Sequence, residues 1–145
     1  MLTFQSDVTI DRPPEVVFPY LVEPELQAKW SDVPMRKVTE GPLGPGSRME
    51  LSFGQGPIHT TIGLELTEVE TGKRMAFTTY STGPVFWDGE YRLEPIGSTG
   101  TRISQTGTLR FTGWWRLLEP IVGAEIKSGE IKELERLKSI LEAPA

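Results

Sequence analysis

His59 is the only histidine in this 145-residue chain, so it is the only side chain whose ordinary pKa lies near neutrality. Ile58, Thr60 and Ile62 alternate around it, which predicts a strand with His59 on the polar side. A general base must reach the proton that it takes. We therefore expect a surface histidine with no catalytic role.

The carboxylates also offer no evident catalytic group. Four of them occupy the polar positions of alternating segments, and are expected on an outer face: Asp7, Glu50, Asp88 and Glu90. Asp32 and Glu40 fall in or near predicted loops at a cavity mouth, with no partner evident. The chain has no cysteine, and no Ser/His/Asp set, phosphate-binding loop or metal cluster stands out. The sequence therefore predicts no catalytic residue, no metal and no cofactor.

Two polar residues are expected to point inward. Tyr91 shares the apolar side of its segment with Trp87, and Gln105 lies on the apolar side of another. The Tyr91 phenol could orient a ligand carbonyl or hydroxyl, or it could be a hydrogen-bonded core tyrosine. Arg48 and Arg92 could clamp a carboxylate, but both fall on the polar face.

The elements that must position these residues follow from the hydrophobic pattern. Residues 2–10 alternate as a half-buried strand, with Ser6 the one polar group on the apolar side. Proline-rich segments then predict two short helices, the second ending near Trp30. Short alternating runs separated by Gly and Pro turns fill residues 35–111. A long helix, kinked at Pro120, is expected from 113 to about 142.

One face of the long helix is expected to be buried, by its apolar spacing: Leu117, Ile121, Ala124, Ile131, Leu134, Leu137 and Leu141. Oppositely charged pairs are expected on the solvent-exposed side of the helix, between Glu133 and Arg136 and between Glu135 and Lys138.

These elements predict an α+β fold in one domain, residues 1–145. A curved antiparallel sheet of about seven strands wraps around the long C-terminal helix, with the two short helices after the first strand. A bent sheet and one helix need not fill the space between them, so the inward side chains could line an internal cavity with an apolar wall, or could simply pack together as a core. The expected ligand contacts are Trp30, Leu51, Phe53, Ile62, Phe77, Trp87, Tyr91, Gln105, Leu117 and Ile121.

Charge and composition exclude several classes of partner. The net charge of −5 gives nucleic acid or an anionic membrane no broad attraction. No apolar stretch approaches the roughly 20 residues that span a bilayer, and the N-terminus lacks the features of a signal peptide. We expect a cytoplasmic protein without stable membrane insertion, and the oligomeric state stays open.

A family resemblance adds to this pattern. The run from Val8 to Phe18, the segment Glu23-Pro24-Glu25-Leu26, Trp30, the turn from Gly44 to Arg48 and the C-terminal Leu134–Glu142 resemble the START-like SRPBCC superfamily. Bacterial members are often labelled polyketide cyclase/dehydrase or lipid-transport proteins. The resemblance covers essentially the whole chain and implies a helix-grip fold around a cavity for hydrophobic molecules.

Two functions remain open at this point. The first is a module that binds a lipid, polyketide or aromatic molecule by shape and burial. The second is a polyketide cyclase or dehydratase-like enzyme that folds its substrate in the same cavity. Trp114-Trp115, just before the helix, is expected to form a hydrophobic lid, with a gate or a membrane contact as alternatives.

Overall fold

A computed structural model describes residues 2–31, 35–41, 43–55, 57–80 and 83–143 of the chain. Within these segments the side chains of Met35, Phe53, Gln55, Ile58 and His59 are outside the description. The expectations for Phe53, His59 and Asp32 therefore remain predictions.

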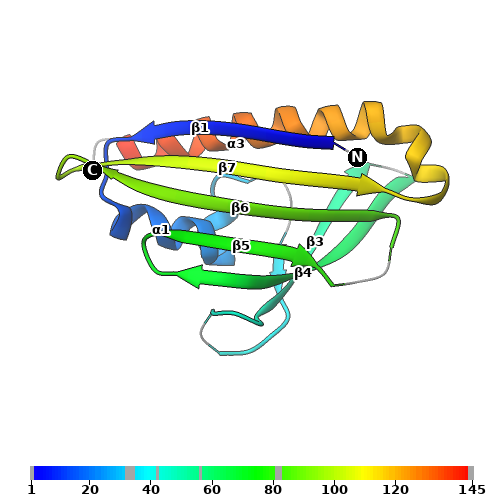
Figure 1. Cartoon of the computed structure of the whole chain (residues 1–145), viewed down its shortest axis with the longest axis horizontal. Helices are drawn as coiled ribbons and strands as arrows, with labels where there is room; N and C mark the ends of the chain where they lie inside the picture. Colours follow the sequence, from blue (N-terminus) through cyan, green and yellow to red (C-terminus); the bar gives the residue numbers. More distant parts are fainter. Residues whose placement is uncertain (1, 32–34, 42, 56, 81–82, 144–145) are drawn as a thin grey trace.

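Seven antiparallel strands form one open, curved sheet in the order β1-β7-β6-β5-β4-β3-β2 (Figure 1). The strands are β1 (Leu2–Ile10), β2 (Met35–Lys37), β3 (Arg48–Gln55), β4 (Ile58–Glu70), β5 (Arg74–Thr79), β6 (Val85–Ile96) and β7 (Gly100–Phe111). Strands β2 to β7 pair with their neighbours in sequence, and β1 closes against β7. The expected curved antiparallel sheet is confirmed.

The helical elements are α1 (Pro14–Val22), α2 (Pro24–Gln27), the 3-10 turn η1 (Gly113–Leu118), the π turn η2 (Glu119–Gly123) and α3 (Ala124–Glu142). Figure 1 shows α3 running along the length of the sheet beside β1, with α1 at the end where β1 finishes. Both short helices begin with a proline in the first turn, where the missing N–H is not needed. Sheet and helices together make the helix-grip fold.

The segment before α3 is not one kinked helix. Pro120 has no backbone N–H, and in a regular α-helix its ring would clash with the carbonyl of Arg116, four residues earlier. The chain instead forms η1, starting at Gly113 with a φ of 63°, and then η2, which contains Pro120. In place of the expected kink within one helix, Pro120 lies in a π turn that follows a 3-10 turn, and regular α-helix begins only at Ala124.

This irregular start makes part of the expected buried stripe wrong. Leu117 is 81% exposed, Ile121 64% and Ile131 41%. For Leu117 and Ile121 the reason is that a 3.6-residue period cannot be carried across a 3-10 turn and a π turn, because each advances the chain by a different angle per residue. Ile131 lies within the regular helix α3, at the edge of its buried face. The helix face that is buried consists of Glu130, Glu133, Leu134, Leu137 and Leu141. Glu133, which was expected on the solvent-exposed side of the helix, is therefore buried.

Two strand glycines shape the inner face of the sheet by admitting aromatic rings from neighbouring strands. A Cβ at Gly89 would lie 2.4 Å from Cζ of Phe77, and one at Gly107 would lie 2.5 Å from Cζ of Phe4. Real side chains do not approach so closely. The rings therefore occupy the space that a larger residue would need, and Phe77 also makes an edge contact with Trp87 at a centroid distance of 6.0 Å.

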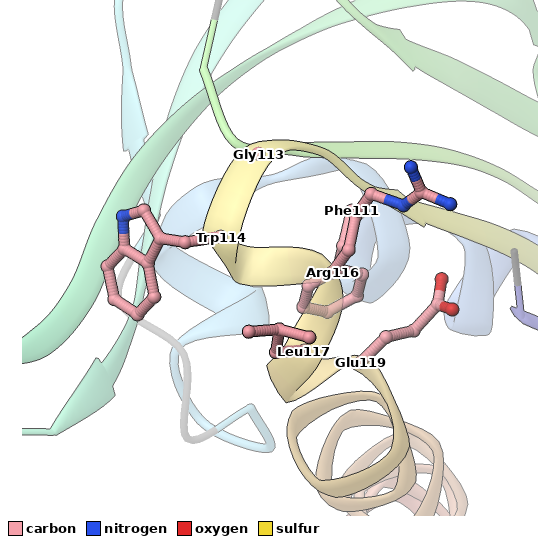
Figure 2. Close-up of a pocket in the computed structure, with 6 residues that line it drawn as sticks. All are labelled: Phe111, Gly113, Trp114, Arg116, Leu117 and Glu119. Atoms are coloured by element: carbon pink, nitrogen blue, oxygen red, sulfur yellow. The ribbon is translucent and has the colours of Figure 1, made fainter.

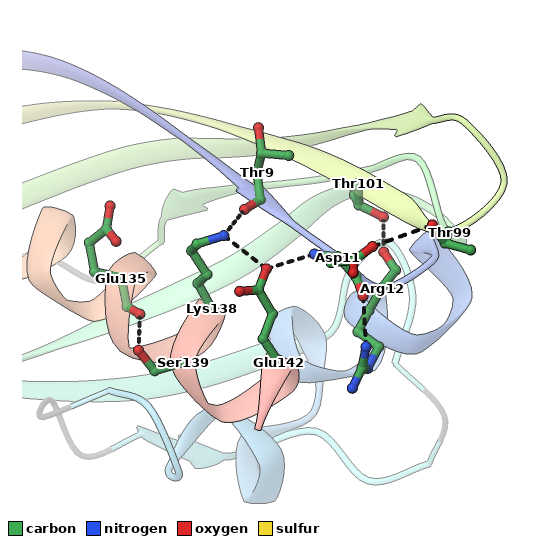
Figure 3. Close-up of polar contacts among 9 residues, drawn as sticks. All are labelled: Thr9, Asp11, Arg12, Thr99, Thr101, Glu135, Lys138, Ser139 and Glu142. Carbon is green, nitrogen blue, oxygen red and sulfur yellow. Dashed lines mark hydrogen bonds and ion pairs between the residues drawn. The ribbon is translucent and has the colours of Figure 1, made fainter. Parts of the chain in front are cut away.

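A polar clamp fastens the end of α3 to the end of β1 (Figure 3). Lys138 Nζ donates to the Thr9 carbonyl at 2.6 Å and to Glu142 Oε2 at 2.8 Å. The same Glu142 oxygen accepts the backbone N–H of Asp11 at 2.8 Å. The clamp holds the helix against the sheet edge, so the interior between them has a fixed wall at this end.

The outer face of the sheet carries the charges that the sequence placed there. Asp7 pairs with Arg102 at 3.0 Å, and Glu50 pairs with Arg36 at 2.7 Å. Arg48, on the same face, pairs with Glu65 at 3.0 Å. These side chains are too far outside to act on the interior of the fold.

Candidate functional site

A small cavity of about 30 Å³ lies between the sheet and α3. Its lining is mostly apolar, and consists of Leu21, Gln27, Ser31, Met49, Leu51, Leu64, Met75, Phe77, Trp87, Tyr91 and Glu130. A volume of this size holds about one or two waters. It is well below the roughly 300 Å³ at which sites for drug-sized molecules begin.

The elements place these side chains by simple alternation. Side chains alternate between the two faces along β3, β5, β6 and the part of β4 before its bulge at 66–68, which brings Leu51, Leu64, Phe77 and Tyr91 onto one concave surface. Helices α1 and α2 close one end of this surface, and α3 supplies Glu130 from the opposite side.

A polar network runs along one side of the cavity. Gln105 Nε2 donates to Glu130 Oε2 at 2.7 Å and to the Tyr91 hydroxyl oxygen at 3.2 Å. Ser6 Oγ donates to Gln105 Oε1 at 3.4 Å. The four residues come from β1, β6, β7 and α3, so the network depends on the complete fold.

Burial changes the chemistry of this network. Loss of water raises the pKa of Glu130 to about 8, and the neighbouring Glu133 acts in the same direction, while hydrogen bonds from Gln105 and Tyr91 oppose both. The pKa of Tyr91 is raised well above its ordinary value, mainly by burial and then by the charge of Glu130. At neutral pH Glu130 is therefore mostly a carboxylic acid, which can donate a hydrogen bond or a proton.

Gln27 contributes a second polar feature from α2. Its Oε1 atom is buried and has no hydrogen-bond partner in the described part of the chain. Buried polar atoms are nearly always paired, with protein or with water. Since Gln27 lines the cavity, this oxygen is a hydrogen-bond acceptor available to whatever occupies it.

Four of the expected ligand contacts line the cavity: Leu51, Phe77, Trp87 and Tyr91. Gln105 is buried behind them and reaches the cavity through Tyr91 and Glu130. The contact of any of these residues with a ligand stays a prediction.

The other expected contacts whose side chains are described lie elsewhere. Trp30 is buried in the core, where its indole N–H donates to the Tyr20 carbonyl at 2.8 Å. Ile62 is fully buried in the apolar cluster around Trp87. Leu117 and Ile121 are on the surface, so the expectation that they face the interior is wrong.

Sequence reasoning missed Glu130 and Gln27. A signal for Glu130 was present, because it precedes Leu134, Leu137 and Leu141 by 4, 7 and 11 residues, which is the spacing of one helix face. The expectations for this helix concerned Glu133 and Glu135 and did not include Glu130. The placement of Gln27 depends on how α2 packs, and no periodicity in a helix of four residues reveals that.

A larger hollow of about 510 Å³ lies on the surface over η1. It is lined by Phe111, Gly113, Trp114, Arg116, Leu117 and Glu119. Figure 2 shows Trp114 directed to one side of the turn, and Arg116 and Glu119 to the other. Trp114 is 61% exposed, whereas Trp115 is buried against Phe111. This groove is open and none of its lining polar side chains is buried, so the interior is the stronger candidate site.

Within the described segments, no three His, Cys, Asp or Glu side chains are grouped as metal ligands. None of the helices in those segments has the length and apolar character needed to cross a membrane.

The fold and the interior define a helix-grip protein of the START-like class. A family model described as polyketide cyclase / dehydrase and lipid transport matches residues 1–142. The chain belongs to this family. No match was found among curated proteins.

Solved structures agree on the fold. TTHA0849 from Thermus thermophilus is 20% identical with a TM-score of 0.78, over 97% of each chain. Ara h 8.0201 is 18% identical with a TM-score of 0.70, again over 97% of each chain. The di-domain ARO/CYC protein BexL, from the BE-7585A biosynthetic pathway, is 17% identical with a TM-score of 0.70, over 95% of this chain and 45% of that one. At these identities the likeness concerns the fold alone.

Proposed function

We propose that this protein binds an apolar or amphipathic small molecule, of lipid, polyketide or aromatic type, between the sheet and α3. The observation that supports it best is the cavity itself, where Leu51, Phe77 and Trp87 form an apolar wall beside the polar pair Tyr91 and Glu130. An apolar wall with a few placed polar groups is typical of ligand sites. Membership of a family described by polyketide and lipid chemistry supports the same function.

The ligand must open the interior, because about 30 Å³ does not admit a molecule of this class. Met49 and Met75 are the lining residues best able to move, since an unbranched thioether side chain changes rotamer at low cost. Binding is therefore expected to displace these methionines while the clamp at Lys138 stays closed.

Native mass spectrometry before and after organic extraction tests this function. A co-purifying apolar compound, or an added one that shifts the mass of the extracted protein, supports it. Trp87→Ala should weaken binding, whereas Trp114→Ala, a change of the same size at a 61% exposed residue outside the cavity, should not. Binding that is lost in Trp114→Ala and retained in Trp87→Ala would place the ligand outside the interior.

One observation favours an enzyme as the second candidate. The pKa of Glu130, raised to about 8, lies close to neutral pH, where a general acid is most effective. A cyclase or dehydratase-like reaction in the same interior would use Glu130 as proton donor. Glu130→Gln should then abolish conversion of a bound polyketide while leaving its binding within a few fold. Equal loss of binding and conversion would show that Glu130 acts in binding rather than as proton donor, and binding without conversion by the wild-type protein would favour the binding module.

A further inference from the structure

The internal hydrogen bonds of the network determine which groups remain for a ligand. Both N–H bonds of the Gln105 amide are used, one to Glu130 and one to Tyr91. The bond that Ser6 donates to Gln105 Oε1 is consistent with this orientation of the amide. Gln105 itself therefore offers no free donor to the cavity.

Tyr91 and Glu130 together hold two O–H groups when the carboxyl group is neutral. One of these can be used between the two residues, since a hydrogen bond from Tyr91 acts on Glu130. The second O–H has no acceptor within the network, because Gln105 directs both of its N–H groups at Tyr91 and Glu130. Tyr91 and Glu130 both line the cavity, so this side of it offers a hydrogen-bond donor.

The side of the cavity formed by α2 offers a hydrogen-bond acceptor instead of a donor. Gln27 Oε1 is an acceptor that is buried without a partner in the described part of the chain. A ligand that leaves it unpaired forfeits the hydrogen bond that water would have supplied. The lining therefore presents a donor from the pair on β6 and α3 and an acceptor from α2.

We propose that the interior selects an uncharged, hydroxyl-bearing apolar molecule, whose hydroxyl accepts a hydrogen bond from Tyr91 or Glu130 and donates one to Gln27. This inference rests on the proposed function. A hydroxyl is the smallest neutral group that both donates and accepts, so it complements both sides of the lining.

Charged ligands suit the interior less well. An anion would lie beside the Glu130 carboxyl group, which lines the cavity, and would lose its hydration in a mostly apolar lining. A cation would lose its hydration in the same mostly apolar lining, where Glu130 is largely uncharged at neutral pH and pairs with it poorly. A pure hydrocarbon would leave the Gln27 oxygen unpaired.

Four probes that share a benzyl group test the inference: benzyl alcohol, benzyl methyl ether, ethylbenzene and benzylammonium. The alcohol donates and accepts, the ether only accepts, ethylbenzene does neither, and benzylammonium carries a charge. Titration monitored by the Trp87 indole signal in NMR gives an affinity for each. We expect the alcohol to bind about tenfold more tightly than ethylbenzene, with the ether between them and the ammonium weakest.

Two variants assign the preference to residues. Gln27→Leu should remove the advantage of the alcohol over the ether, and Glu130→Leu should reduce the advantage of the ether over ethylbenzene. Gln5→Leu and Glu135→Leu, the same replacements at exposed positions, should change neither ratio. Circular dichroism and thermal unfolding establish that each variant is folded.

The outcomes separate the inference from the proposed function. If ethylbenzene binds as tightly as the alcohol, the interior binds apolar molecules but the hydroxyl selection is wrong. Tightest binding of benzylammonium would overturn the selection in favour of cations. If none of the probes binds the wild-type protein, the inference fails, and the proposed function fails with it only if native mass spectrometry also finds no bound apolar compound. Unchanged ratios in Gln27→Leu and Glu130→Leu would also overturn the inference.

Discussion

Nε2 of Gln105 on β7 lies 2.7 Å from Oε2 of Glu130 on α3, and this contact joins the sheet to the helix through the interior. The glutamine belongs to the inward row of a strand, and the glutamate to the buried face of a helix. An ionised carboxylate at this position would be costly unless it were well paired. Burial therefore favours a proton on Glu130, whereas the hydrogen bond from Gln105 acts in the opposite direction and only partly offsets it.

The stability of the protein should fall as pH rises, because of Glu130. Its pKa is about 8 in the folded protein against an ordinary value of 4.5, so the folded state binds more protons than the unfolded state between these two values. The Glu130 contribution to the free energy of unfolding should therefore decrease by up to about 1.4 kcal/mol per pH unit across this window, and level off above it. Urea unfolding at several pH values measures the slope.

Glu130→Gln is the matched variant for this prediction. A glutamine has nearly the same shape and does not titrate, so its unfolding free energy should lack the Glu130 contribution to the slope. Glu135→Gln, at an exposed position on the same helix, should keep the wild-type slope. Parallel wild-type and Glu130→Gln profiles between about pH 5 and 8 would contradict a raised pKa.

The alternation of side chains between the two faces of each strand explains why much of the fold could be predicted from sequence. A period of two is short and local, so it placed Ser6 and Gln105 on the inner side and the charges of Asp7 and Glu50 on the outer side. The curved antiparallel sheet and the C-terminal helix followed from the same pattern.

The candidate site was less predictable, because it depends on the phase of α3. The turns η1 and η2 change the rotation of the chain before the helix begins, so Leu117 and Ile121 point outward. The pattern also gave no measure of how closely side chains fill the interior. Cavity volume depends on rotamers across many elements, and no local spacing contains that information.

Gly89→Ala should destabilise the protein by about 1–3 kcal/mol, because a well-filled interior resists an added methyl group. The new Cβ would lie 2.4 Å from Cζ of Phe77, which would have to move from its place over the strand. Chemical denaturation measures the change. Gly129→Ala in α3, where a Cβ meets nothing within 4 Å, should instead stabilise by about 0.5–1 kcal/mol. Equal effects of the two changes would contradict the close packing at Gly89.

Trp30→Phe should destabilise the protein by about 1–3 kcal/mol, because it leaves the Tyr20 carbonyl without its hydrogen bond. The indole N–H lies 2.8 Å from that oxygen, and Trp30 is 1% exposed. Trp114→Phe, at a 61% exposed residue, should change stability by no more than about 0.5 kcal/mol. Thermal and urea unfolding distinguish the two. A larger effect at Trp114 would contradict their placement.

Lys138→Met should raise the pKa of Glu142. The hydrogen bond from Lys138, followed by that from the Asp11 backbone, holds this pKa below its ordinary value in the folded protein. The corresponding stabilisation is present above the ordinary pKa of a glutamate, and is lost as pH falls through the lowered value. A carbon-detected NMR titration of the Glu142 carboxyl measures the shift directly.

The clamp makes a second prediction for the same variant. The difference in unfolding free energy between wild type and Lys138→Met should be larger at neutral pH than in acid, because protonated Glu142 no longer attracts the ammonium group. Lys132→Met, at an exposed position on α3, should leave the Glu142 pKa unchanged. If both variants leave it unchanged, the 2.8 Å contact between Lys138 and Glu142 does not persist in solution, and the end of α3 must be held to β1 by the Thr9, Asp11 and apolar contacts.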